Sequence, residues 1–386
     1  MLTKMTLKMQ TQLILAGEPR PRLAGAVTMP VFQSAMYETR SEDKDYNSIQ
    51  YIRCSNTPNH EALHTKLAAI EGSETALVTG SGMAAITSTL LTLLRVGDHI
   101  MMQDSLYGGT QAFLTEDGPA LGLSLSSFDA SKPASWEAHV TPKTRMIYVE
   151  SISNPLLRIP QLAEVVRFAR RHGLVACIDN TFATPINFRP IAFGFDVVIH
   201  SASKYLNGHA DICAGVVAGR REVIEKVRAK VTHLGGALDP HAAWLLHRAL
   251  KTLAIRVDRQ NRSAETIARF LAAHPAVARV IYPGLETHPQ YAQARELFSG
   301  FGGMISFEPI GGVPAAERLL ERLAIISIAP SLGGVESNIT RPAATTHLGV
   351  SADERQRMGI GDALLRLSIG LEDPDDLIVD LSEGLA

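Results

Sequence analysis

Short apolar runs and amphipathic stretches alternate along the first 240 residues of the chain. Between residues 58 and 70, apolar side chains at Leu63, Leu67 and Ile70 recur at the spacing of one helix face. The same reasoning predicts strands over 75–79, 99–102, 145–150, 174–178, 196–200 and 215–218. It predicts helices over 58–70, from the turn at 80–82 to residue 94, and over 162–172. Short apolar strands between amphipathic helices indicate an α/β fold with a mostly parallel sheet, covered by helices on both faces.

The pattern changes beyond Pro240. A long helical stretch is predicted from about residue 241 to 275, with a break near 256–261. Shorter strands follow over 277–282, 304–308, 325–328 and 366–371, with few helices between them. Residues 1–50 carry scattered prolines among polar residues and predict an irregular arm. We therefore expect three parts: an N-terminal arm (1–50), a large domain (51–240) and a smaller C-terminal α+β domain (241–386) on an open sheet.

Composition narrows the class of protein. The chain has 386 residues, 46% of them hydrophobic, which is ample for a large core and two domains. Its 37 basic and 39 acidic residues give a formal net charge of -2, so we expect no nucleic-acid partner. No apolar run approaches the roughly 20 residues that a membrane-spanning helix needs, so no membrane partner is expected either.

The cysteines indicate a reducing compartment. Cys54, Cys177 and Cys213 are odd in number and form no CxxC pair. This argues against a disulfide framework or a cysteine zinc site and favours the cytosol. The first ten residues include Lys4 and Lys8 but no continuous apolar stretch of the kind found in signal peptides. We therefore expect a cytoplasmic location.

A lysine follows the apolar run 197–199, where a buried strand is expected to end. Burying an ammonium without a partner costs free energy, so Lys204 needs a chemical reason to stand there. One explanation is that its nitrogen forms a Schiff base with an aldehyde cofactor. The hydroxyls of Ser201 and Ser203, just before it, are suited to a phosphate group. Together these residues predict a site for pyridoxal 5'-phosphate (PLP).

A glycine turn offers a second site. Gly80-Ser81-Gly82-Met83-Ala84-Ala85 matches GxGxxA, follows a predicted strand and opens a helix. Such a turn directs backbone N–H groups at a phosphate. Asp104, about 20 residues further on and just past the next strand, would complete a dinucleotide fingerprint. The pattern leaves open a phosphate-binding turn, a nicotinamide or flavin dinucleotide site, and a simple tight turn.

A third pattern points to zinc. His60-Glu61-Ala62-Leu63-His64 matches HExxH, which on a helix places two imidazoles on one face. It begins two residues after Pro58, in the first helical turn, and no third ligand is apparent nearby. We expect a surface helix whose His and Glu side chains are solvated, and no metal site.

Asp179 strengthens the PLP interpretation. It ends the strand predicted over 174–178, and Lys204 follows the next predicted strand. Ligands of parallel sheets bind outside the carboxyl ends of the strands. Both side chains and the 80–82 turn should therefore converge on one rim. There Asp179 would keep the pyridine nitrogen protonated, and Lys204 would carry the cofactor and move protons.

With these residues in view, the chain from about residue 25 to its end resembles the PLP-dependent enzymes of cysteine and methionine metabolism. These include cystathionine γ-synthase, cystathionine γ-lyase, cystathionine β-lyase and methionine γ-lyase. The motifs that carry the resemblance are residues 201–211, 179–182, 107–110, 331–337 and 366–373. The resemblance implies the PLP-dependent transferase fold type I. It also implies a homotetramer made of two dimers, in which the arm takes part in subunit contacts and each active site needs two chains.

The resemblance implies further roles around the cofactor. Tyr107 would stack on the pyridine ring and help to transfer protons. Gly82 and Met83 would donate backbone N–H groups to the phosphate, and Asn154 would contact the ring hydroxyl.

It also implies contacts with the substrate and a second subunit. Arg366, helped by Ser331, would hold the substrate α-carboxylate. Strand alternation places Arg366 opposite Leu367, and a guanidinium can hold a carboxylate at two points. Tyr51 and Arg53 would reach the phosphate of a neighbouring subunit.

Several positions depart from the family pattern. The stretch Asn56-Thr57-Pro58 exchanges Thr and Pro relative to the usual order, and Ser203 stands where many members have Thr. Gly109 stands where methionine γ-lyases usually carry a cysteine. Gln50 and Pro330 occupy places where cystathionine γ-lyases and γ-synthases often have glutamates that hold the far end of the substrate.

The expected activity is therefore elimination or replacement at the γ- or β-carbon of a sulfur amino acid. A cystathionine γ-lyase or γ-synthase is the leading assignment, and methionine γ-lyase or cystathionine β-lyase are alternatives. An NAD-dependent oxidoreductase that uses residues 80–85 is the alternative from a different class.

Overall fold

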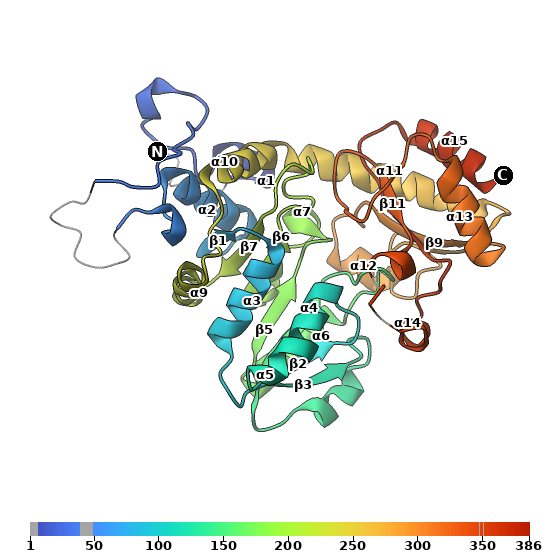
Figure 1. Cartoon of the computed structure of the whole chain (residues 1–386), viewed down its shortest axis with the longest axis horizontal. Coiled ribbons are helices and arrows are strands. Elements are labelled where there is room, and N and C mark those ends of the chain that lie inside the picture. The colour runs from blue at the N-terminus through green and yellow to red at the C-terminus, as the bar shows by residue number, and fades with distance from the viewer. Residues whose placement is uncertain (1–6, 39–48, 347, 350) are drawn as a thin grey trace.

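The structure, a computed structural model, describes residues 7–38, 49–346, 348–349 and 351–386 (Figure 1). The predicted arm thus lies partly outside the described residues. Two sheets organise the chain: seven strands in the order β1-β7-β6-β5-β4-β2-β3 and five in the order β10-β11-β12-β9-β8. The large sheet consists of β1 (Thr75–Thr79), β2 (His99–Gln103), β3 (Ser124–Phe128), β4 (Thr144–Glu150), β5 (Val175–Asp179), β6 (Val197–Ser201) and β7 (Gly215–Gly219).

The large sheet confirms the predicted mostly parallel arrangement. Strands β3, β2, β4, β5 and β6 pair in parallel, whereas β7 pairs antiparallel with both β6 and β1. Side chains alternate between two cores: Ala76 and Val78 of β1 face one, and Leu77 faces the other. The carboxyl ends of the parallel strands therefore form one continuous rim.

Helices cover both faces of this sheet. Helices α2 (Pro58–Glu71), α6 (Leu162–His172) and α10 (Pro240–Ala249) contribute to the core on one face, and α3 (Gly82–Leu93) and α9 (Arg221–Leu234) to the core on the other. Helix α6 ends where the sequence predicts, because Gly173 takes the left-handed conformation with φ 64. The shorter α4 (Gly108–Ala112), α5 (Gly118–Ala120), α7 (Thr184–Asn187) and α8 (Pro190–Phe193) fill loops between strands.

The C-terminal part is built on the smaller sheet. Its strands are β8 (Val277–Ile281), β9 (Met304–Pro309), β10 (Ser327–Ile328), β11 (Asn338–Thr340) and β12 (Leu365–Ser368). Helices α11 (Leu253–Ala273), α13 (Gly312–Arg322) and α15 (Pro374–Leu385) share its core, and α12 (Tyr291–Leu297) and α14 (Ala352–Met358) lie in its connections. Figure 1 shows α11 extending from the large sheet to this smaller one. The boundary near residue 240 remains a prediction.

Two expectations about helices are wrong. Residues 9–15 of the predicted irregular arm form helix α1 (Met9–Leu15), which is held where the buried Lys66 amine donates to the Leu13 carbonyl at 2.6 Å. The break in the long C-terminal helix lies at Leu250–Thr252, not at 256–261. Arg256 is polar but points inward and donates to the Tyr205 carbonyl at 2.8 Å. Strands β3 and β11 and helices α12, α13, α14 and α15 were also not predicted.

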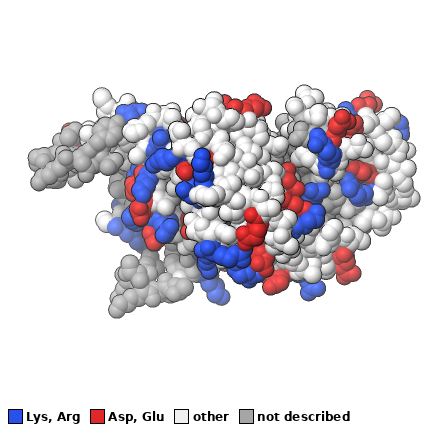
Figure 2. Space-filling view, turned by 90° about the horizontal axis from the view of Figure 1, so that it is seen from below, with Lys and Arg blue, Asp and Glu red and all other residues white. Residues whose placement is uncertain are grey.

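Charge is distributed without segregation on the face shown in Figure 2, where basic and acidic side chains are interspersed. None of the described helices combines the length and the apolar character that a bilayer crossing requires. The thiols of Cys54 and Cys177 are buried, and that of Cys213 is exposed.

Candidate active site

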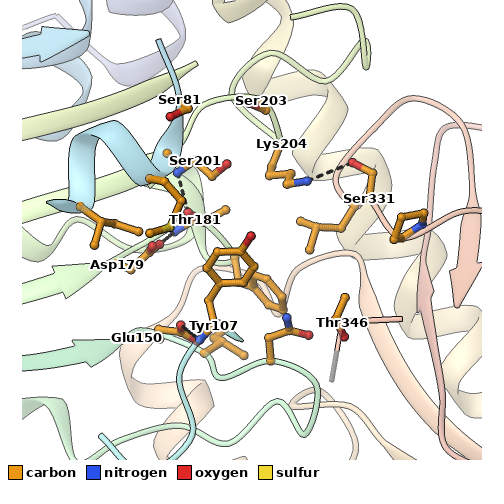
Figure 3. A pocket seen from close by; sticks show the side chains of 18 of the residues that line it. Ser81, Tyr107, Glu150, Asp179, Thr181, Ser201, Ser203, Lys204, Ser331 and Thr346 are labelled. Carbon is orange, nitrogen blue, oxygen red and sulfur yellow. Dashed lines mark hydrogen bonds between the residues drawn. The ribbon is translucent and has the colours of Figure 1, made fainter. Parts of the chain in front are cut away.

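Four strand ends and the C-terminal part enclose one cavity of about 420 Å³ (Figure 3). The glycine turn follows β1, and Glu150, Asp179 and Ser201 are the last residues of β4, β5 and β6. The cavity therefore lies outside the carboxyl ends of the parallel strands, as the sequence predicts. Its walls include the predicted residues Gly82, Met83, Tyr107, Asn154, Asp179, Ser201, Ser203, Lys204, Ser331 and Arg366.

Lys204 lies in the loop after β6 and points into the cavity. Its amine donates to the Ser331 hydroxyl at 3.1 Å, across the gap between the two sheets (Figure 3). Burial lowers the pKa of the Lys204 amine, and the positive charge of Arg366 lowers it further. A lowered pKa increases the neutral, nucleophilic fraction of the amine at a given pH.

The glycine turn has the geometry of a phosphate site. Helix α3 begins at Gly82, and the Ser81 hydroxyl accepts the Ala84 N–H at 3.0 Å. A Cβ atom on Gly82 would lie 3.0 Å from the Ser201 Cβ and Oγ atoms, so only glycine leaves this approach open. An anion here would face a helix N-terminus and a hydroxyl, which fits the phosphate of PLP.

The loop that carries Lys204 is braced by Ser203. The Ser203 hydroxyl accepts the Ala214 N–H at 2.9 Å and donates to the Ala214 carbonyl at 3.3 Å. The Ser201 N–H donates to the Thr181 hydroxyl at 2.8 Å, which ties the end of β6 to the loop after β5. Both serines thus line the cavity and also hold its wall together.

Two carboxyl groups stand side by side on the rim. Glu150 and Asp179 are register partners on β4 and β5 and are both buried. Burial raises the pKa of Asp179, although hydrogen bonds from Thr181 oppose the rise. Burial also raises the pKa of Glu150, and the neighbouring Asp179 charge raises it further. Asp179 therefore fits the predicted partner of the pyridine nitrogen, since a cation placed there would be favoured by a buried carboxylate.

Arg366 enters the cavity from β12 of the smaller sheet. Its neighbours Leu365 and Leu367 belong to the C-terminal core, so strand alternation directs Arg366 the other way, as predicted. Its guanidinium donates to the Asn154 side-chain oxygen at 2.9 Å and to the Pro330 carbonyl at 2.7 Å. Burial lowers the pKa of Arg366 to about 10, so the group stays charged at neutral pH. The structure thus brings Arg366 and Asn154 into direct contact.

Tyr107 leads into α4 and presents its ring to the cavity. The side chain is 44% exposed, so little packing holds it. Its backbone N–H donates to Glu150 Oε1 at 2.5 Å. A Cβ atom on Gly109 would lie 2.6 Å from the Tyr107 Cε1 atom, so the ring occupies space that a side chain at 109 would need.

Two predicted residues lie outside this cavity. Tyr51 precedes the short helix Ile52–Cys54, and the Arg53 guanidinium lies 5.4 Å from the Tyr51 ring centre. Arg53 also donates to the Thr232 carbonyl at 3.3 Å. Their predicted role in the site of a neighbouring subunit stays a prediction.

The unusual order Asn56-Thr57-Pro58 opens helix α2. Pro58 is the first helical residue, where its missing N–H costs nothing. The Thr57 hydroxyl bonds to His60 Nδ1 at 2.7 Å, and the Asn56 side-chain oxygen accepts the Tyr51 N–H at 2.8 Å. The exchanged residues Thr57 and Pro58 therefore stand at the start of helix α2, and Asn56 holds the loop that carries Tyr51.

The HExxH pattern is structural, and the expectation that its histidines are solvated is wrong. His60 and His64 are both buried. His60 is held between the Thr57 hydroxyl and the Leu238 carbonyl, at 2.7 and 2.8 Å. Burial lowers the pKa of His60 to about 4. Within the described parts of the chain, no cluster of three or more His, Cys, Asp or Glu could hold a metal ion.

The dinucleotide hypothesis lacks its acidic residue. Asp104 is exposed and is not among the residues that line the cavity. The glycine turn instead faces Ser201, Ser203 and Lys204.

The lining residues that were not predicted include Glu150, Thr181, Cys213 and Thr346. Glu150 ends a predicted strand just as Asp179 does, so the same rim argument could have found it. Thr181 lies two residues after Asp179, within a motif already singled out. Cys213 and Thr346 carry no signal of their own in the sequence.

Comparisons with known proteins agree with this geometry. The model of the family described as Cys/Met metabolism PLP-dependent enzyme matches residues 10–386. The chain is 42% identical over 370 residues to an L-methionine gamma-lyase of Pseudomonas putida, covering 94% of this chain and 93% of that protein. It is 40% identical over 378 residues to a cystathionine beta-lyase of Coxiella burnetii, covering 97% of each.

Solved structures show the same fold. The crystal structure of metB from Corynebacterium glutamicum matches with a TM-score of 0.93 at 33% identity, and that of cystathionine gamma-lyase from Lactobacillus plantarum complexed with L-serine with 0.92 at 36%. Each match covers 98% of both chains. These similarities confirm the predicted PLP-dependent transferase fold type I. Fold, cavity and similarity over nearly the whole length lead to one conclusion: the chain belongs to the Cys/Met metabolism PLP-dependent enzyme family.

Proposed function

We propose that this chain is a PLP-dependent carbon–sulfur lyase or γ-substituent transferase that acts on a sulfur amino acid. It would work by elimination or replacement at the γ- or β-carbon. The observation that supports this most strongly is the convergence of Lys204, Asp179 and Arg366 on one cavity of about 420 Å³. Each supplies a different need: an amine for the cofactor aldehyde, a carboxylate for the pyridine nitrogen and a guanidinium for the substrate carboxylate.

The residues of the cavity divide the chemistry among them. Bound PLP supplies an electron sink for the carbon next to the substrate amine. Asp179 would hold the ring-nitrogen proton. The Lys204 amine, released when the substrate amine takes its place, would remove the proton from the substrate α-carbon. The Tyr107 hydroxyl faces the same space and would assist in moving protons.

Substrate binding would depend on Arg366. Its Asn154 and Pro330 contacts fix the guanidinium plane, so little freedom is lost when a carboxylate binds. Ser331 would help, because its carbonyl lies 3.2 Å from the same guanidinium and its hydroxyl contacts Lys204.

A second copy of the chain would complete the site. Lys204 and Arg366 are the cationic residues among the described residues of the cavity. Lys204 is assigned to the cofactor aldehyde and Arg366 to the substrate carboxylate, so neither is assigned to the phosphate. Tyr51 and Arg53 of a neighbouring subunit would then contact the phosphate. Exposed apolar side chains in the arm, Val27 at 75% and Met36 at 78%, are suited to subunit contacts. We propose a homotetramer in the cytoplasm, with the domain boundaries given above.

The substrate assignment has two candidates. The sequence favours a cystathionine γ-lyase or γ-synthase. One feature of the cavity favours a methionine γ-lyase instead. Among its described lining residues the charged ones are Glu150, Asp179, Lys204 and Arg366, and Pro330 stands where a glutamate would hold a distal ammonium. An uncharged far wall suits an uncharged thioether better than a second amino-acid group.

Product analysis tests both levels of the proposal. Purified enzyme with PLP is given cystathionine, methionine, or an O-acylated homoserine plus cysteine, side by side. Release of a 2-oxo acid with ammonia marks lysis, and a new thioether marks replacement. A Lys204→Ala variant should lose every one of these products. Wild-type enzyme that binds PLP but forms none of them contradicts the proposed activity.

A further inference from the structure

One buried carboxylate on the rim has no role so far. Glu150 is 5% exposed and ends β4 beside Asp179. Its side-chain oxygen accepts the Tyr107 N–H at 2.5 Å, and the Asn154 backbone N–H also bonds to the carboxyl group, although burial and the neighbouring Asp179 charge raise the pKa of Glu150. A buried carboxylate that accepts backbone N–H groups makes a strong, directional contact. Glu150 therefore connects the two loops that carry Tyr107 and Asn154.

The same residue holds the Tyr107 loop at its other end. The backbone N–H of Glu150 donates to the Gln103 side-chain oxygen at 3.0 Å. Gln103 ends β2, and its amide nitrogen donates to the Ser105 carbonyl at 3.2 Å. The short loop between β2 and α4 is thus attached to Glu150 at its start, through Gln103, and at its end, through Tyr107.

This attachment matters because packing does not fix the Tyr107 ring. The side chain is 44% exposed, and no side-chain cap holds the start of α4. A ring that must lie over a bound cofactor needs a backbone that is fixed before the cofactor binds, since a displacement of about 1 Å is enough to weaken a site.

We infer that Glu150 is a positioning residue: its carboxylate fixes the Tyr107 backbone so that the ring faces the cofactor. The inference rests on the proposed PLP function. It predicts that Glu150 acts on cofactor affinity through Tyr107 and not through its proximity to Asp179.

A double-mutant cycle separates these routes. The affinity of the apo-protein for PLP is measured by absorbance titration for the wild type, Glu150→Gln, Tyr107→Ala and the double variant. Glutamine keeps one acceptor oxygen but replaces the second carboxyl oxygen with an NH2 group, which cannot accept a backbone N–H. Glu150→Gln should weaken PLP binding about tenfold, and the double variant should bind within about twofold of Tyr107→Ala alone.

Asp380 provides a matched control. It too is 5% exposed, and it accepts the Ala324 and Ile326 N–H groups at 2.7 and 2.9 Å, but it lies outside the cavity. Asp380→Asn should lower the unfolding temperature without changing the affinity for PLP, whether it is introduced into the wild type or into Tyr107→Ala. If Glu150→Gln does not fold, Glu150→Asp keeps the carboxyl group, retracts it by one methylene and should show the same non-additivity.

The outcomes are distinct. Wild-type apo-protein that fails to bind PLP contradicts the proposed function itself. If the wild type binds PLP and Glu150→Gln binds it equally well, the positioning role alone is wrong. It is also wrong if the losses of PLP affinity in Glu150→Gln and Tyr107→Ala multiply in the double variant.

Discussion

The Lys204 amine and the Ser331 hydroxyl lie 3.1 Å apart although 127 positions separate them in the sequence. Lys204 follows a strand of the large sheet, whereas Ser331 lies in the C-terminal part and presents its carbonyl to Arg366 at 3.2 Å. One residue thus contacts both the group assigned to the cofactor and the group assigned to the substrate. The contact therefore links the large-sheet side of the cavity to its C-terminal side.

Ser331→Ala should lower kcat/KM by about five- to tenfold, because a typical hydrogen bond contributes about 1 kcal/mol. Steady-state kinetics with the preferred substrate measures this loss. Ser331→Thr keeps the hydroxyl and should recover most of the activity. Equal losses in the two variants would show that the hydroxyl contact has no role.

The charge of Arg366 should set the protonation of Lys204. Burial and this charge lower the pKa of the amine, and the neutral amine is the form that attacks an aldehyde. In Arg366→Gln the pKa should rise, so the pH profile for attachment of PLP to the apo-protein should shift to higher pH.

Arg366→Lys keeps a positive charge and serves as the control for this shift. Its profile should stay close to that of the wild type, as followed by absorbance in a stopped-flow instrument. A shift of the Arg366→Gln profile to lower pH would contradict the electrostatic account.

Gly109 should be required for the Tyr107 ring position. A Cβ atom there would come within 2.6 Å of the ring, which is exposed enough to rotate away. Gly109→Ala should therefore weaken PLP binding several-fold while leaving the unfolding temperature within a few degrees of the wild type. Gly118→Ala, where an added Cβ atom would meet no atom closer than 3.8 Å, is the control. Unchanged PLP affinity in Gly109→Ala would mean that the ring does not contact the cofactor.

His60 should make the apo-protein sensitive to acid. Its pKa falls from 6.5 to about 4 on folding because of burial, so the unfolded chain binds the extra proton first. The free energy of unfolding should decrease as pH drops from 6.5 towards 4, by on the order of 3 kcal/mol from this residue. Above 6.5 this residue contributes no pH dependence.

Urea unfolding at several pH values measures this slope. His60→Gln keeps a donor for the Leu238 carbonyl but does not titrate, so its slope between pH 6.5 and 4 should be smaller. The same substitution at exposed His233 is the control. A slope that His60→Gln leaves unchanged would assign the acid sensitivity to other groups.

The sequence predicts the rim of the cavity well. The order of strands and helices places Asp179 and Lys204 after successive strands, and parallel pairing then brings their side chains to one edge. Strand alternation is enough to turn Arg366 away from the C-terminal core. Local periodicity and the geometry of parallel sheets carry this information.

The features that were missed depend on contacts between distant segments. The polar Arg256 looks like a helix break in the sequence, but it serves as an internal donor to the Tyr205 carbonyl. The sequence pattern predicts a solvated His60, whereas in the fold its ring is buried and bonds to the Leu238 carbonyl. Helix α1 forms where the Lys66 amine of another helix donates to the Leu13 and Ile14 carbonyls. Periodicity cannot distinguish an exposed polar side chain from one whose partner lies far along the chain.

The central claim is that Lys204 carries the cofactor. The most direct measurement is borohydride reduction of the PLP-loaded enzyme, followed by proteolysis and mass spectrometry of the peptides. We predict one phosphopyridoxyl group, on the peptide that contains Lys204, and none in Lys204→Ala. A reduced cofactor found on another lysine, or an active enzyme in which no lysine is modified, would contradict the account.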